Sequence, residues 1–185
     1  MKFIVRLAVS MLTVAFALSG PIVNAATDAP ASSAVSPEYL IVLRERINLL
    51  TQQLKNSEKE YQSGNLPLEV IWKQRLALDT TRLLLWRAEA GHPPVPGAAE
   101  AVLRLKYAET YVSMLEGHFK SGALPETMVL SAKLDANQAK LDYLALRPQV
   151  KNPTALEKAI AMLKDYPTNP VTDTELKTLL AVEAP

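Results

Sequence analysis

The sequence predicts an all-α fold: an antiparallel four-helix bundle made of two repeated helical hairpins, followed by two short C-terminal helices. Three observations predict it. Apolar residues recur in steps of three and four, glycine and proline separate these stretches, and the whole pattern returns after 58 residues. We expect the bundle to span residues 37–150, with hairpins over 37–90 and 97–148.

The N-terminus has the composition of a secretory signal over residues 1–25. A positive start and an apolar stretch are followed by Gly20-Pro21 and by small residues that end at Ala25. A retained membrane anchor is the alternative, but the apolar run is short for a span of about 20 residues. We therefore expect cleavage, a periplasmic mature protein with no membrane span, and a flexible tether at residues 26–36.

The first hairpin begins at Pro37, which suits the first turn of a helix, with Ser36 as the N-cap. Gly64 supplies the left-handed residue that ends this helix, and Pro67 opens the returning helix. The apolar stripe of the first helix is Leu40, Leu43, Ile47, Leu50, Leu54 and Tyr61.

The second hairpin repeats the first. Ser63-Gly64-Asn65-Leu66-Pro67 aligns with Ser121-Gly122-Ala123-Leu124-Pro125. The apolar positions Ile47, Leu50 and Leu54 correspond to Leu105, Ala108 and Val112, so the seam keeps one register in both copies. Neither hairpin can bury its stripe alone, and we expect the two to pack together across the proline-rich link at 91–97.

A polar residue lies in the middle of each returning helix, Asp79 in the first and Asn137 in the second. The expected seam around Asp79 is Trp72, Leu76, Leu83 and Trp86. The expected seam around Asn137 is Leu130, Leu134, Leu141 and Leu144. A polar residue inside a seam can fix its register, whereas a rotated seam would leave both residues at the solvent edge.

Residues 151–185 are expected to form a helical C-terminal extension. Two short helices are predicted over 154–164 and 172–182, separated by a turn rich in proline. Their apolar residues would pack on the bundle: Leu156, Ile160, Leu163, Leu176, Leu179 and Leu180.

The composition argues against several functions. Twenty Lys+Arg against 19 Asp+Glu give no one-signed field for nucleic acid, and the absence of cysteine excludes disulfides, thiolate metal sites and cysteine nucleophiles. Only His92 and His118 are present for histidine chemistry, and no glycine-rich phosphate loop occurs. We expect no enzymatic activity and no cofactor.

Two other functions compete with this expectation. A small-ligand or metal-binding bundle is one, because Met114 and His118 lie one helical turn apart and His92 follows Glu89 at Glu-x-x-His spacing. An enzyme is the other, because residues 43–50 resemble the first helix of the secreted helical chorismate mutases.

The turns carry a family resemblance. Tyr61-x-x-Gly64-x-Leu66-Pro67, repeated as Phe119-x-x-Gly122-x-Leu124-Pro125, resembles the hairpin turns of the outer-membrane efflux factor family, the TolC-like and CzcC-like channels. That family also has two helical hairpins per chain, but with β-strands where this sequence has only the link at 91–97. The resemblance implies periplasmic hairpins that dock on an adaptor protein through Gly64, Leu66, Pro67, Gly122, Leu124 and Pro125. The alternative is that glycine followed by Leu-Pro is simply a common way to end one helix and begin another.

We therefore expect a non-enzymatic periplasmic interaction protein that presents hairpin turns or helix faces to an envelope protein, in efflux or secretion, with self-association as a further option. Ile41, Val42 and Leu49 lie outside the narrow seam of the first helix. They would contact a partner or widen the apolar stripe that faces the core.

Overall fold

The computed structural model describes residues 35–92, 97–150 and 152–183. These residues form helices and turns without a strand, which confirms the all-α prediction. The elements are α1 (Pro37–Gln62), α2 (Leu68–Glu89), α3 (Ala98–Lys120), α4 (Glu126–Leu146), the 3-10 helix η1 (Arg147–Gln149), α5 (Pro153–Met162) and α6 (Asp173–Ala181). The predicted signal at 1–25, the tether as far as residue 34 and the link residues 93–96 lie outside the described ranges.

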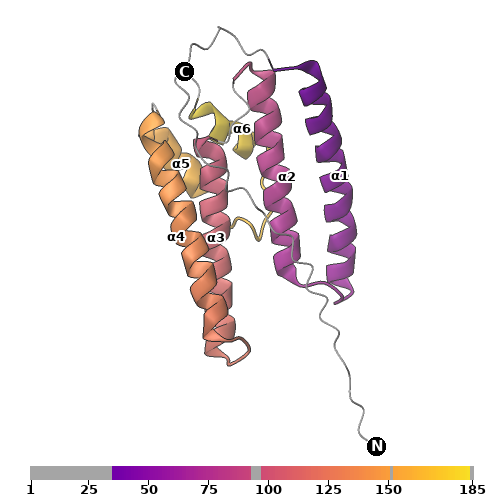
Figure 1. Ribbon diagram of the computed structural model, residues 1–185, viewed down its shortest axis with the longest axis vertical. Helices are drawn as coiled ribbons and strands as arrows, with labels where there is room; N and C mark the ends of the chain where they lie inside the picture. Colours follow the sequence, from indigo (N-terminus) through magenta and orange to yellow (C-terminus); the bar gives the residue numbers. More distant parts are fainter. Residues whose placement is uncertain (1–34, 93–96, 151, 184–185) are drawn as a thin grey trace, which may run out of the picture. The chain divides into compact units, whose positions relative to one another are not determined.

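The four long helices form two hairpins, α1 with α2 and α3 with α4, and the hairpins meet through α2 and α3 (Figure 1). Helix α1 lies beside α2 and α4 lies beside α3, with no extensive contact between α1 and α4. Helix α6 packs on α5, α2 and α3. The inner helices α2 and α3 are thus covered on more sides than the outer helices α1 and α4.

Side-chain caps begin three of the helices. Ser36 accepts a hydrogen bond from the Tyr39 N–H at 3.2 Å, as predicted, and Asn152 accepts one from the Ala155 N–H at 3.0 Å. Before α6, the Glu175 carboxylate accepts a bond from the Thr172 N–H at 2.8 Å, which completes a capping box. Helix α2 begins at Leu68, one residue later than predicted.

The main hydrophobic core lies where α2 and α3 meet the C-terminal helices. It contains Leu83 of α2 and Leu103 of α3, together with Leu156, Leu163, Leu176 and Leu179 from the C-terminal segment. These last four residues are among those predicted to pack on the bundle, and their burial confirms that prediction. Two smaller clusters lie inside the hairpins, one around Leu43 and Leu85 and one around Leu115 and Val129.

The predicted seam is correct for α2 and wrong for α4. Trp72 and Leu83 are buried, and Leu76 and Trp86 pack against the main core. Their four counterparts on α4 are exposed, and α4 buries Val129 and Ala132 instead. The polar residues of the two seams differ in burial in the same way, since Asp79 is buried and Asn137 is exposed. Neither of the two expectations therefore holds for both copies.

Asp79 joins α2 to the C-terminal segment. Arg82 lies 3.3 Å from its carboxylate and also pairs with Asp173 at the start of α6. Burial raises the pKa of Asp79 to about 6, an effect opposed by Arg82, by the Tyr166 hydroxyl and by Arg75. Burial, together with the neighbouring Asp79, also raises the pKa of Tyr166 well above its usual value.

Arg75 holds the connection between α5 and α6 from the same face of α2. Its guanidinium donates to the carbonyl oxygens of Pro167 at 3.1 Å and Thr168 at 2.5 Å, and pairs with Glu58 of α1 at 3.0 Å. On the other side of the connection, the Thr110 hydroxyl of α3 donates to the Tyr166 carbonyl at 3.0 Å. The C-terminal segment is thus tied to both hairpins.

A buried charged group closes the junction of α2 and α3. Arg87 forms a bidentate pair with Glu100 at 2.6 and 2.7 Å, and it also pairs with Glu183. Glu100 further accepts from the Gly97 N–H at 2.8 Å, and Glu183 accepts from the Ala99 N–H. A Cβ at Gly97 would lie 2.7 Å from both the Arg87 guanidinium and the Glu183 carboxylate, so a larger residue there would displace these side chains.

Candidate functional site

The first predicted contact site is the turn at residues 63–67. Ser63 ends α1, and Gly64 has a φ of 77°. The Asn65 N–H donates to the Glu60 carbonyl and the Gly64 N–H donates to the Tyr61 carbonyl, both at 2.9 Å. These two bonds define a Schellman motif, in which a left-handed glycine satisfies the last carbonyls of a helix.

The turn at residues 121–125 has the same conformation. Gly122 has a φ of 76°, and the corresponding bonds join Ala123 to His118 at 2.9 Å and Gly122 to Phe119 at 2.8 Å. Pro67 and Pro125 then adopt nearly equal backbone angles before α2 and α4. The repeat found in the sequence is therefore a structural repeat at the turns.

The predicted contact residues divide between the ends of two hairpins (Figure 1). Gly64, Pro67, Gly122 and Pro125 are exposed, whereas Leu66 and Leu124 are half-buried. Leu124 packs against the cluster around Leu115. Each turn thus presents a small exposed surface, and Leu124 supports its own hairpin.

The largest row of exposed apolar residues lies on α4. We call Leu130, Leu134, Leu141 and Leu144 the α4 leucine row; their exposed fractions are 52%, 69%, 60% and 44%. With Asn137 in the middle, the five positions are spaced by four, three, four and three residues, which is the spacing of a coiled-coil seam. This spacing places them along one line of the helix that no described residue covers.

The two flanks of the α4 leucine row differ in charge. Lys133, Lys140 and Arg147 follow one flank, and Ser131, Gln138 and Ala145 follow the other. Lys133 pairs with Glu116 of α3 at 2.7 Å, and its hydrogen bond and charge hold the pKa of Glu116 below the usual value. The row therefore has one basic flank and one neutral flank.

Helix α1 also exposes apolar side chains. Ile41, Val42 and Leu49 are each about three-fifths exposed. These residues do not widen the core stripe, so the second of the two expectations for them is wrong. They leave α1 with a free apolar surface, but without the regular seam spacing of α4.

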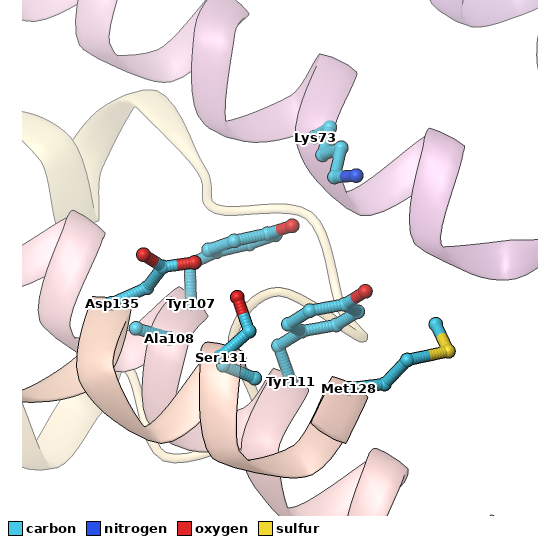
Figure 2. A pocket seen from close by; sticks show the side chains of 8 residues that line it. Lys73, Tyr107, Ala108, Tyr111, Met128, Ser131 and Asp135 are labelled. Carbon is cyan, nitrogen blue, oxygen red and sulfur yellow. The ribbon is translucent and has the colours of Figure 1, made fainter. Parts of the chain in front are cut away.

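A cavity of about 310 Å³ lies where α2 approaches α3 and α4. Figure 2 shows Lys73 of α2 on one side and Tyr107, Tyr111, Ser131 and Asp135 on the other. The two tyrosine rings are stacked, with centroids 5.9 Å apart, and the Lys73 ammonium lies 5.8 Å from the Tyr111 ring centroid. No local pattern in the sequence indicates this cavity, because its lining comes from three helices.

The pKa values of both tyrosines in this cavity are raised, which favours the neutral hydroxyl. Burial raises the pKa of Tyr107, and nearby Tyr111, Glu69 and Asp135 raise it further. Burial and Glu69 likewise raise the pKa of Tyr111, whose hydroxyl lies 3.4 Å from Glu69. The buried hydroxyl of Tyr107 has no hydrogen-bond partner among the described residues. The lining of the cavity therefore includes the Lys73 ammonium, the Asp135 carboxylate and one unsatisfied hydroxyl.

Of the residues considered for metal binding, Met114 and His118 share helix α3, whereas His92 lies beyond the end of α2. Met114 packs in the cluster around Leu115, His118 is exposed near the end of α3, and His92 follows the end of α2. In the described ranges, no three His, Cys, Asp or Glu side chains gather in a group that would hold a metal ion. In the segment compared with chorismate mutase, Arg44 pairs with Glu89 at 2.7 Å and Arg46 is exposed.

No family model, curated protein or solved structure matches this chain. The resemblance of the turns to the efflux factor family therefore stays a prediction. Within the described ranges, none of the helices combines the length and the apolar character needed to cross a membrane.

Proposed function

We propose that this protein is a non-enzymatic interaction protein of the cell envelope, which binds a partner helix along α4 and presents its hairpin turns beside it. The observation that carries this proposal is the α4 leucine row, which exposes four leucines along one line of a helix. Regular apolar rows of this kind mark interaction surfaces, because exposing them to water is unfavourable.

The form of the row favours a helix as the bound element. A seam repeating every three and four residues matches the side-chain spacing of another helix lying nearly parallel to it. The row is one residue wide and has charged neighbours, including Lys133, Lys140 and Asp142. A surface for lipid would instead present a broad apolar face.

The predicted signal at residues 1–25 supports an envelope location, and the resemblance of the turns supports a role in efflux or secretion. N-terminal sequencing of the protein recovered from cells tests the location directly. We expect the mature chain to begin at Ala26 and to fractionate with periplasmic proteins. A chain that retains Met1 and sediments with membranes would contradict this part of the proposal.

The binding proposal is tested by photo-crosslinking in intact cells. A photoreactive residue is placed at Leu134 in the α4 leucine row, at Asn65 or Ala123 in the turns, and at exposed Gln53 of α1 as the control. We expect the same protein to be captured from Leu134 in every repeat, and to be lost when Leu141→Glu is added. Equal capture from Leu134 and Gln53, or no effect of Leu141→Glu, would overturn the proposal.

A small-ligand-binding protein is the second candidate, and the cavity at Lys73 and Asp135 favours it. The ammonium, the carboxylate and the unsatisfied Tyr107 hydroxyl suit a small molecule with both an acidic and a basic group. Amino acids serve as probes in thermal unfolding, because a ligand of the folded state raises Tm. The rise should disappear in Asp135→Asn but persist in Lys55→Gln, a control on α1.

A further inference from the structure

We infer that the helix bound along the α4 leucine row is α4 of a second copy of this chain, running parallel and in register. The inference rests on the proposed function and names the occupant of the same surface. Asn137 of one copy then faces Asn137 of the other at the centre of the contact, with two leucine layers on either side.

Asn137 is the first reason to choose a second copy. An asparagine amide offers both donors and an acceptor, so two facing amides can bond to each other within an apolar seam. In a parallel pair, identical seam positions face each other. In an antiparallel pair, or against a purely apolar helix, Asn137 would face leucine and its amide would lose water without gaining a partner. The row is therefore complementary to itself in one orientation.

The charges beside the row favour the same orientation. In a parallel pair, the basic flank of one helix faces the neutral flank of the other, so that Lys133 lies near Gln138 and Lys140 lies near Ala145 of the second copy. In an antiparallel pair, the two basic flanks would face each other and repel. A pair of identical copies closes on itself with two-fold symmetry and leaves neither row exposed.

The repeat gives an independent reason for a covered surface. The positions of α2 that correspond to the α4 leucine row are covered by the rest of the chain, and Leu83, the counterpart of Leu141, is fully buried. The row on α4 runs over 15 residues, from Leu130 to Leu144, or about 21 Å of helix. This length is small for a stable interface, so we expect a weak dimer that forms as the concentration rises.

Single cysteines test the arrangement, because the chain has no cysteine of its own. Leu130→Cys, Asn137→Cys and Leu144→Cys are prepared separately in the full chain, with Gln53→Cys on α1 as the matched exposed control. A disulfide needs Cα atoms within about 7 Å. Mild oxidation should convert each of the three variants to a covalent dimer at least fivefold faster than the control.

The outcomes separate the alternatives. In an antiparallel pair with Asn137 facing Leu134, Leu130 faces Leu141 of the second copy. A mixed disulfide between Leu130→Cys and an added Leu141→Cys variant, with none from either variant alone, would show this antiparallel pair and overturn the inference. No disulfide above the control, together with a monomer in sedimentation equilibrium, would also overturn it. In that case, capture of a different protein from Leu134 in cells would still support the proposed function. If no protein is captured, both the proposed function and this inference are wrong.

A second measurement distinguishes a specific contact along the α4 leucine row from non-specific association. Leu134→Glu should abolish dimerisation in sedimentation equilibrium without changing the thermal unfolding of the monomer, because Leu134 is exposed. Asn137→Leu should strengthen association at least tenfold and allow the antiparallel disulfides, because the polar layer that sets the orientation is gone. Unchanged association in either variant would contradict the inference.

Discussion

Helices α2 and α4 hold the same place in the two hairpins, yet their matching faces have opposite surroundings. On α2, Leu83 is fully buried, and Trp86 lies beneath Lys177 of α6, whose ammonium is 5.3 Å from the ring centroid. On α4, the counterparts Leu141 and Leu144 are exposed. The same apolar spacing is thus a core in one hairpin and a surface in the other.

The difference lies in the neighbours that each helix has. Helix α2 contacts α1, α3 and α6, whereas the extensive contacts of α4 among the long helices are with α3 alone. The inner helices even bury charged residues, Asp79, Arg87 and Glu100, while the outer helices expose leucine, isoleucine and valine. Spacing predicts a helix face that needs covering, and the tertiary arrangement decides which element covers it.

The largest expected effect on stability concerns the buried ion pair at the junction of α2 and α3. The buried residues that the structure describes on α4 include no charged group. Glu100→Ala leaves Arg87 and Glu183 without the central carboxylate, and we expect a loss of about 3–5 kcal/mol in the free energy of unfolding. Urea unfolding measures it. Glu109→Ala, which removes an exposed acid from the same helix, should change the free energy by less than about 0.5 kcal/mol. Equal effects in the two variants would contradict the role given to Glu100.

Matched leucines test the comparison directly. Leu83→Ala should lower the free energy of unfolding by about 2–5 kcal/mol, because it leaves a cavity in the main core. Leu141→Ala, at the equivalent position of α4, should change it by less than about 0.5 kcal/mol when the protein is dilute enough to be monomeric. Urea unfolding of both variants at one dilute concentration measures the two losses. Similar losses would mean that Leu141 is covered in solution even in the monomer.

The polar residues of the two seams should differ in pH dependence. Burial raises the pKa of Asp79 from 3.8 to about 6, so its protonated form stabilises the folded protein at low pH. That contribution is complete below pH 3.8 and is lost as the pH rises through 6, a change of roughly 3 kcal/mol. The free energy of unfolding of the wild type, minus that of Asp79→Asn, should therefore fall between pH 4 and pH 7. The same difference for Asn137→Asp, an exposed acid, should stay nearly constant, and a flat curve for Asp79→Asn would refute its burial.

The smallest expected effects lie in the turns, where the two hairpins agree. Gly64→Ala and Gly122→Ala each force a side chain into the left-handed region, with open space around the added carbon. We expect each to cost about 1–2 kcal/mol, and the two losses in thermal unfolding to be nearly equal. Unequal losses would show that one turn is supported by contacts that the other lacks.

Local signals in the sequence predict much of this molecule. The Ser36 cap, the glycines of both turns and the two C-terminal helices all depend on residues close together in the chain. The 58-residue repeat is found by comparing two stretches of the sequence, without knowledge of the fold. Such signals do not predict whether the apolar face of α4 is covered, since periodicity identifies an apolar face but not the element that packs on it. The buried group at Arg87 was missed because Glu183 is 96 positions away. The spacing from Gly97 to Glu100 did offer a signal, because an acid three residues after a helix start can accept a bond from the first N–H.

The ion pair between Arg87 and Glu183 also limits when the junction of the two hairpins can form during synthesis. A nascent chain that has reached the end of α4 already contains both hairpins, but it lacks the carboxylate that Arg87 shares with Glu100 and the leucines that cover α2. Until α5, α6 and Glu183 have been synthesised, the apolar face of α2 lacks the C-terminal residues that complete its cover. The junction between the hairpins is therefore completed late in synthesis. A chain whose synthesis stops before this segment would expose apolar faces on both α2 and α4.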